Sequence, residues 1–380
     1  MSAATTGVVI SGTGMHPFGR FDGTTVTEMG VTAVRAALDE AGNPAFQAAF
    51  CATVYSGVAA GHKVLGALGL TGVPIVDVEA GCASGGAALM LAAGAIRAGQ
   101  YDTVLVFGIE KMPRGIIRSS FFEPWREQSG LAATPAYFAL RAQRLMRESG
   151  VTKQHLAEVV VKNRANGVDN PIAMFRKSVS VDDVLGSRLV CEPLHLFMLC
   201  SPNEGAAAVV LSRADLGAPA SPKLLAAVLR SHLPGSVLGE ATPLSGIDDD
   251  EIPPPSTLAA TAAFEEAGLG PDDLDLVECQ DTDAARELLA YEELGLCPKG
   301  GAAALVEERA TAPGGRLPVN VSGGLLSKGE PLGASALAQV VELTDQLRER
   351  GGPRQVEGAR VGLAHTVGRG ANAAVVVLSR

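Results

Sequence analysis

The sequence predicts an α/β protein with two parts of similar size, and three observations support this fold class. Short segments rich in Val and Ile alternate along the chain with Ala-rich segments of helical length, which is typical of parallel α/β layers. The chain has 380 residues, enough for two hydrophobic cores. A joint rich in Gly and Pro, residues 216–222, would separate the two parts.

The expected elements are defined by residue type and by length. The predicted strands are short and rich in β-branched residues, and they are residues 75–78, 103–108, 207–212, 223–229, 275–279 and 373–378. The predicted helices are longer and rich in Ala, and they are residues 27–41, 87–98, 136–149, 257–267 and 334–348.

Composition excludes several classes of protein. Hydrophobic residues make up 47% of the chain and aromatic residues only 4%, so we expect aliphatic cores. The formal net charge is −10 and no basic stripe offsets it, which argues against a nucleic-acid-binding protein. The six cysteines form no C-x-x-C pair and the six histidines are scattered. We therefore expect neither a metal site nor a disulfide framework.

The chain shows no signal for secretion or membrane insertion. The N-terminus lacks a charged segment followed by a long apolar one. Residues 80–96 carry no charge, but they are too few and too rich in Gly and Ser for a membrane span. We expect a cytoplasmic protein with a buried helix in this region.

Cys82 is the main candidate for a nucleophile. It lies in the small-residue stretch 79–86, after the predicted strand 75–78 and before a predicted helix. At a strand-to-helix turn, backbone N–H groups and the positive end of the helix dipole favour the thiolate, which is the reactive form. A small buried cysteine without a chemical role is the alternative interpretation.

Five segments together resemble the thiolase superfamily, in particular the sterol-carrier-protein type of thiolase and the related thiolase-like lipid-transfer proteins. They are the Cys82 turn, residues 106–112, 201–209 and 287–298, and the loop 320–334 with Gly362 to His365 beyond it. The resemblance implies a five-layered αβαβα fold made of two similar βαβαβ halves. These would span about residues 1–215 and 221–380.

The resemblance also implies a loop domain, here about residues 113–188, that meets the phosphates of coenzyme A. Residues 141–190 hold nine Lys or Arg against five Asp or Glu, a local excess in an acidic chain. Arg176 and Lys177 are therefore candidate contacts for the phosphates. A solvated surface would account for the same charges.

The resembled thiolases surround the nucleophile with catalytic groups that this chain has partly replaced. Where they have Gly-His-Pro, this chain has Gly-Glu-Pro with Glu330 in the middle. Where they have His-Asp-Cys-Phe, residues 280–283 are Gln-Asp-Thr-Asp. The last histidine of the pattern survives as His365. The resemblance then makes His365 the expected base for Cys82.

The replaced residues change the chemistry that is available. Gln280 keeps an N–H donor for an oxyanion, whereas Thr282 cannot carry protons near neutral pH. A carboxylate at Glu330 would oppose a thiolate nearby, but in a dry pocket it could act as a general base. It could instead cap the helix predicted from residue 334.

Other residues of these loops are weaker candidates. Gly324, Ser327 and Gly329 are candidate substrate-binding residues, because the glycines would bring backbone close to a substrate carbonyl; turn formation alone also explains the glycines. Asp281 and Asp283 are expected to face solvent or an interface.

Three functions remain open from the sequence. The first is an acyltransferase that forms or cleaves a carbon–carbon bond on an acyl-CoA through acyl-Cys82, with the thioester as substrate and no bound cofactor. The second is an aldolase-type homologue that acts on a β-hydroxyacyl thioester beside a small OB-fold partner. The third is a non-catalytic acyl-CoA-binding subunit. The resemblance further implies a homodimer, and the low charge around residues 75–110 suits a buried interface.

Overall fold

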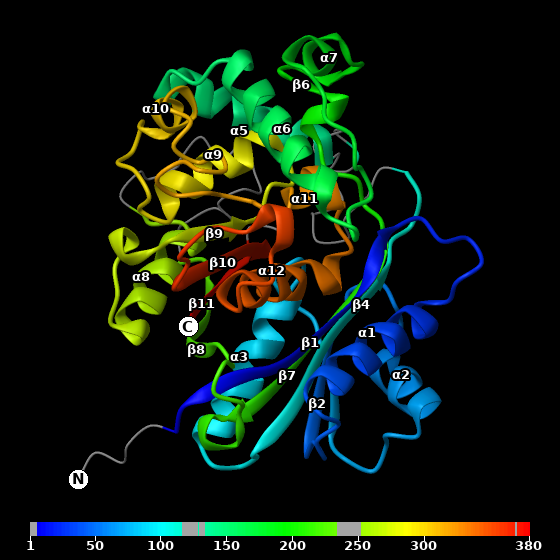
Figure 1. The fold of residues 1–380 in the computed structure, drawn as a ribbon. Helices are drawn as coiled ribbons and strands as arrows, with labels where there is room; N and C mark the ends of the chain where they lie inside the picture. The colour runs from blue at the N-terminus through cyan, green and yellow to red at the C-terminus, as the bar shows by residue number, and fades with distance from the viewer. Residues whose placement is uncertain (1–5, 116–127, 129–133, 234–251, 369–370) are drawn as a thin grey trace.

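The structure is a computed structural model, and it describes residues 6–115, 128, 134–233, 252–368 and 371–380 (Figure 1). The predicted loop domain therefore lies partly outside the described residues, at 116–127 and 129–133. No helix in the described ranges has the length and apolar character needed to cross a bilayer.

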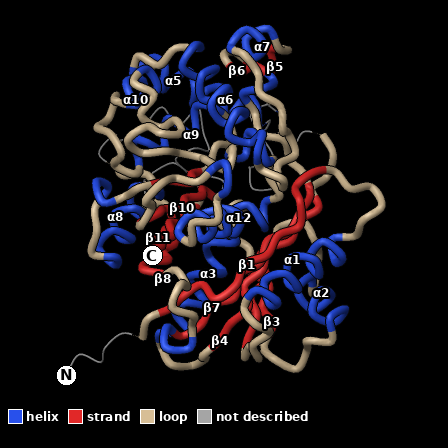
Figure 2. The backbone as a smooth tube through the Cα atoms, in the orientation of Figure 1, coloured by secondary structure: helices blue, strands red, loops and turns tan. Residues whose placement is uncertain are grey.

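Most strands of the described residues, drawn red in Figure 2, belong to one large mixed sheet with the order β3-β2-β4-β7-β1-β8-β11-β10-β9. The bounds of these strands are β1 Val8–Gly19, β2 Ala48–Ala52, β3 Ile75–Val78, β4 Thr103–Lys111, β7 Glu204–Arg213, β8 Lys223–Ser231, β9 Leu276–Cys279, β10 Val361–Gly368 and β11 Asn372–Ser379. Pairing is parallel for β3-β2-β4 and for β10-β9, and antiparallel elsewhere.

The sheet is weakly joined at its centre. Among the described residues, Val9 and Lys223 are the one registered pair between β1 and β8, and the backbone N of Ile10 also donates to Pro222 O at 2.9 Å. The other neighbouring strands pair over several residues. The sheet therefore consists of an N-terminal part that ends at β1 and a C-terminal part that begins at β8.

Helices cover both parts and also separate them. α1 (Val26–Glu40) and α2 (Ala60–Leu68) pack on the outer face of the N-terminal part, and α8 (Pro255–Ala267) packs on the C-terminal part. α3 (Ser84–Arg97) and α12 (Leu332–Leu347) contact strands of both parts and each other (Figure 1). The order is thus helix, sheet, helix, sheet, helix, and the predicted five-layered α/β fold is confirmed.

The two middle helices can approach closely because α3 has glycine where it meets its neighbours. A Cβ on Gly85 would lie 3.0 Å from the Ala336 Cβ of α12, and one on Gly86 would lie 2.4 Å from the Ala374 Cβ of β11. α12 is buried along almost its whole length. Its apolar sequence therefore reflects its place between two sheets.

A smaller helical layer covers one end of this core. Its first part, which we call the cap, comprises α5 (Thr134–Ser149), α6 (Lys153–Asn166), α7 (Val181–Gly186) and the hairpin of β5 (Leu189–Cys191) and β6 (Leu194–His195). α9 (Ala284–Glu293), α10 (Ala302–Glu307) and α11 (Gly324–Lys328) lie against α5 and α6 (Figure 1). Residues of the cap therefore lie next to the ends of the sheet strands.

Every predicted strand and helix is present, with ends that shift by a few residues. The prediction omitted several elements, among them β1, β2, β10, α2, α6 and α9. The division at residues 216–222 stays a prediction.

Candidate functional site

A cavity of about 1250 Å³ is lined by residues of both sheet parts and of the cap. Cys82, Gln280 and Glu330 all lie in its wall. These three residues come from segments that are far apart in the sequence, so the fold brings together three of the predicted catalytic candidates. Thr282 lies in the same wall.

Cys82 is placed by the turn between β3 and α3. Gly81 has φ of +61°, and a Cβ there would lie 3.2 Å from Gly368 Cα. The turn therefore needs glycine for its conformation and for its close contact with β10. Cys82 precedes α3 by two residues and packs against Met112 and Leu332. This position near a helix N-terminus favours an anion, as the sequence predicts.

Glu330 is held by hydrogen bonds to two cavity residues. Its Oε1 accepts from Gln280 Nε2 at 2.9 Å, and its Oε2 accepts from Cys200 Sγ at 3.3 Å. The side chain is 5% exposed. α12 has no side-chain cap, and its N-cap residue is Pro331. The interpretation of Glu330 as a helix cap is therefore wrong, because its carboxylate points to Gln280 and Cys200.

Gln280 follows β9 and is fixed at both ends of its amide. Its Oε1 accepts from the backbone N of Val367, while its Nε2 donates to Glu330. A side-chain amide has two N–H donors, so the second N–H can still face a substrate oxygen. The amide thereby sets the orientation of the Glu330 carboxylate.

Cys200 is a cavity residue that the sequence reasoning missed. It lies in the cavity wall and donates to Glu330. Burial in the wall, and after it the Glu330 carboxylate, raise the pKa of the Cys200 thiol well above its usual range. Cys82 lies in the same cavity wall, and its thiol contributes to the same shift. Cys200 directly precedes the segment 201–209, but no spacing in the sequence links it to Cys82.

His365 does not line this cavity among the described residues. It lies on β10, it is fully buried, and its Nε2 is 3.0 Å from Ser256 Oγ on α8. Burial, with the Arg286 guanidinium second, lowers the pKa of His365 from 6.5 to about 3. The expected role of His365 as base for Cys82 therefore finds no support in these contacts, since the ring is in contact with Ser256 of α8.

Gly324, Ser327 and Gly329 are also outside the cavity wall. Ser327 is fully buried and its Oγ donates to Phe175 O at 2.6 Å. Gly329 has φ of +84°, and a Cβ there would lie 2.0 Å from Asn203 Nδ2. These residues fix the conformation of the loop that leads to Glu330, through contacts outside the cavity. Their expected contact with substrate stays a prediction.

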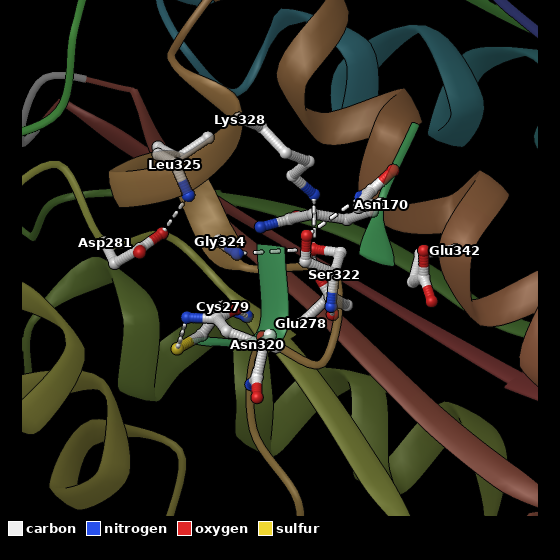
Figure 3. A network of polar contacts seen from close by, with 12 residues as sticks. Asn170, Glu278, Cys279, Asp281, Asn320, Ser322, Gly324, Leu325, Lys328 and Glu342 are labelled. Carbon is white, nitrogen blue, oxygen red and sulfur yellow. Dashed lines mark hydrogen bonds and ion pairs between the residues drawn. The ribbon is translucent and has the colours of Figure 1, made fainter. Parts of the chain in front are cut away.

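A buried polar network holds this loop against β9 (Figure 3). Lys328 Nζ donates to Ser322 Oγ at 2.6 Å and pairs with Glu278 at 3.4 Å. Burial raises the pKa of the Glu278 carboxyl. Asp281 lies on the other side of the network and accepts from the backbone N of Leu325 at 2.6 Å. The loop that carries Glu330 is thus fixed at several points.

Asp281 and Asp283 are fully buried, so their expected surface position is wrong. Asp283 is the N-cap of α9, where Oδ1 accepts from the backbone N of Ala285 at 3.0 Å. It also pairs with Arg141 of α5. Both carboxyl groups accept hydrogen bonds from N–H groups in the first turns of helices, α9 for Asp283 and α11 for Asp281. Such N–H groups have no partner within their own helix, which explains why these polar side chains are buried.

Arg176 and Lys177 line the cavity and are exposed, as is Arg188. They come from the cap, in the region where the sequence shows its local excess of basic residues. A cluster of exposed cations at a cavity can bind the phosphates of a ligand.

Comparison with protein families gives two matches along the chain. The thiolase N-terminal domain matches residues 8–215, and the thiolase C-terminal domain-like family matches residues 249–380.

Several curated proteins are similar over most of the chain. An acetyl-CoA acetyltransferase of Methanothermobacter thermautotrophicus is 39% identical and covers 82% of this chain and 82% of its own length. Benzoylsuccinyl-CoA thiolase subunit BbsB of Thauera aromatica is 34% identical over 96% of each chain. Sterol carrier protein 2 of Bos taurus is 36% identical over 86% of this chain, which spans 62% of that protein's length.

Among solved structures, the Ltp2-ChsH2(DUF35) aldolase has a similar fold. The TM-score is 0.85, the identity is 22%, and the alignment covers 98% of this chain and 97% of that chain. This similarity concerns the fold.

Proposed function

Since the chain belongs to the thiolase superfamily and is similar to sterol-carrier-protein-type thiolases, we propose that it is an acyltransferase. It would form or cleave a carbon–carbon bond on an acyl-CoA through an acyl-Cys82 intermediate. One observation carries the proposal: Cys82 lies at the start of α3 in the same cavity wall as the Glu330 carboxylate.

In the first step, Cys82 Sγ attacks the thioester carbonyl. A bond forms between Sγ and the carbonyl carbon, and the bond from that carbon to the sulfur of coenzyme A breaks. Glu330 accepts the thiol proton and passes it to the departing coenzyme A thiolate. The second N–H of Gln280 and the helix N-terminus stabilise the oxyanion of the tetrahedral intermediate.

In the second step, a second acyl-CoA loses a proton from its α-carbon to Glu330. The resulting carbanion attacks the acyl-Cys82 carbonyl, so a carbon–carbon bond forms and the bond to Cys82 breaks. Cys82 then recovers a proton from Glu330. Cys200 donates a hydrogen bond to the carboxylate, which helps to hold it in the orientation that both transfers require. The reverse sequence cleaves the bond.

Arg176 and Lys177 would bind the phosphates of coenzyme A. Their exposure and their place in the cavity wall support this role. Such contacts would serve binding of the nucleotide part and not the chemical step.

The test is covalent labelling with acyl-CoA that carries a radiolabel in the acyl group. The wild-type protein should take up label, and Cys82→Ala should take up none. Cys297→Ala is the matched control, because Cys297 is a partly buried cysteine outside the cavity wall. If neither wild type nor control takes up label from a broad set of thioesters, the acyltransferase proposal fails.

A second function is favoured by the carboxylate at position 330. In an aldolase-type reaction, Glu330 would remove the hydroxyl proton of a β-hydroxyacyl thioester. The bond between the α- and β-carbons would break, the β-carbon would become the carbonyl carbon of an aldehyde or ketone, and the α-carbanion of the remaining thioester would take the proton back from Glu330. No acyl-Cys82 forms in this reaction. The relative BbsB is named as a subunit and the Ltp2-ChsH2(DUF35) structure as an aldolase, which supports a partner subunit in this alternative. The OB fold of that partner is what the family resemblance implies.

Two variants separate these functions. Cleavage that survives in Cys82→Ala but is lost in Glu330→Gln supports the aldolase-type reaction, whereas loss in Cys82→Ala with label uptake in wild type supports the acyltransferase. Thioester binding without turnover, alone or with a partner subunit, would leave a non-catalytic acyl-CoA-binding subunit.

The edge of the sheet suits a homodimer. β3 is the last strand of the described sheet at that side, and an exposed edge strand pairs readily with another chain. Val76 on β3 is 44% exposed, and Leu91 on the neighbouring α3 is 42% exposed. We propose that a second copy of the chain covers these residues.

A further inference from the structure

Arg164 is a buried cation in the wall of the Cys82 cavity. It lies on α6 of the cap, and the residue is only 7% exposed. Its guanidinium is stacked on aromatic rings: Cζ is 4.0 Å from the centroid of the Phe175 ring and 5.6 Å from that of Phe197. These rings fix the guanidinium plane, and their cation–π attraction is too weak to replace an anionic partner.

Arg164 has no carboxylate partner among the described residues. None of their carboxylates forms an ion pair with it, and its Nε is buried without a hydrogen bond. Neighbouring cations differ in this respect: Lys162 pairs with Glu287 at 2.5 Å, and Arg141 pairs with Asp283. Lys162 and Arg164 belong to the same helix, so a paired cation and one without a carboxylate partner among the described residues lie two residues apart.

A buried guanidinium without a counter-ion is costly to the folded protein. Burial lowers the pKa of Arg164 to about 10, so the group stays charged near neutral pH. Buried cations that persist without a partner in the free protein are expected where a ligand supplies the anion. The planar fork of arginine suits a carboxylate, which it can bind through two parallel hydrogen bonds.

We infer that Arg164 binds a carboxylate on the acyl chain of the substrate, so that the preferred substrates are acyl-CoA thioesters with a second carboxyl group. This inference rests on the proposed acyl-CoA function and names its substrate class. The phosphates of coenzyme A are the other possible anions. Arg176, Lys177 and Arg188 are exposed cations of the same cavity and suit the phosphates, whereas Arg164 is enclosed.

The surroundings of Arg164 favour the carboxylate of an acyl chain. Phe138, Leu196 and Leu199 share the wall with Phe175 and Phe197. An acyl chain would place its methylene groups against these apolar side chains and its terminal carboxylate against the guanidinium. A hydrated phosphate would gain little from them.

The experiment measures dissociation constants by calorimetry on full-length Cys82→Ala, which blocks covalent turnover. The ligands are pairs of equal chain length: succinyl- and butyryl-CoA, glutaryl- and pentanoyl-CoA, adipyl- and hexanoyl-CoA. At least one dicarboxylic member should bind about 10- to 100-fold more tightly than its partner, as expected for hydrogen bonds to a charged group. If every pair binds equally, the inference is overturned.

Arg164→Gln in the same background should remove that preference and leave the affinity for free coenzyme A unchanged. Arg164→Lys keeps the charge without the fork, so it should retain part of the preference. Arg188→Gln is the matched control, which should weaken all coenzyme A ligands alike.

Thioesters of pantetheine lack the nucleotide phosphates and separate the two sources of anion. The dicarboxylic preference, and its loss in Arg164→Gln, should persist with them. If Arg164→Gln weakens coenzyme A and every thioester of it to the same extent, Arg164 binds a phosphate and the inference fails. If no thioester binds to any variant, the proposed function itself fails, which is a different outcome.

Discussion

The burial of His365 predicts how the stability of the protein depends on pH. The structure lowers the pKa of His365 from 6.5 to about 3. Below pH 6.5 the unfolded chain therefore binds a proton at this residue that the folded protein does not bind. The contribution of the neutral His365 to the free energy of unfolding is therefore complete above pH 6.5 and is lost as the pH falls toward 3.

The size of this effect follows from the two pKa values. Within the window, one proton of difference changes the free energy of unfolding by about 1.4 kcal/mol per pH unit. Between pH 7 and pH 4 the loss attributable to His365 is then about 3 kcal/mol. Arg286, which disfavours the imidazolium, and Glu293, which favours it, act on the same ring.

The perturbation is His365→Gln, which removes the titrating ring and can keep a hydrogen bond to Ser256. Urea denaturation from pH 7 to pH 4 should show a shallower loss of stability in this variant than in wild type. His62→Gln serves as the control, because His62 is exposed on α2. If wild type and His365→Gln lose stability in parallel, the ring is not held neutral inside the protein, and a role for His365 at Cys82 would have to be reconsidered.

Three further predictions concern the cap, the cavity and the sheet edge. Asp283→Ala removes the α9 cap and the partner of Arg141, so the free energy of unfolding should fall by about 3 to 5 kcal/mol; a urea midpoint close to that of wild type would contradict this buried contact. Alanine at both Arg176 and Lys177 should raise KM for acyl-CoA about 10-fold with little change in kcat, and an unchanged KM would refute the phosphate contact. Val76→Lys should give a monomer in sedimentation, whereas a persistent dimer would place the interface elsewhere.

The sequence predicts the fold well because its periodic signals are strong. β3 and α3 appear where the Val-rich run and the small-residue run predict them. β1 is missed because its twelve residues include Gly and Pro, which are weak strand formers. α9 is missed because buried charged residues, Arg286 and Glu287, interrupt its apolar face.

The candidate site was predictable only in part, because spacing does not reveal side-chain direction. Cys82, Gln280 and Glu330 lie in one cavity wall, as their places in the resembled motifs suggest. His365 is in such a motif too, yet its ring binds Ser256. Cys200 and Arg164 carry no motif of their own, so only the three-dimensional arrangement identifies them.

The contact between the two middle helices has a consequence for the chemistry. Cys82 comes just before α3 and Glu330 just before α12, and these helices touch where Gly85 meets Ala336. The packing of the two helices therefore sets the distance between the Cys82 thiol and the Glu330 carboxylate. A methyl group at position 85 would push the two helices apart and so move the reactive groups without changing either of them. We therefore expect few substitutions to be tolerated where α3 contacts α12.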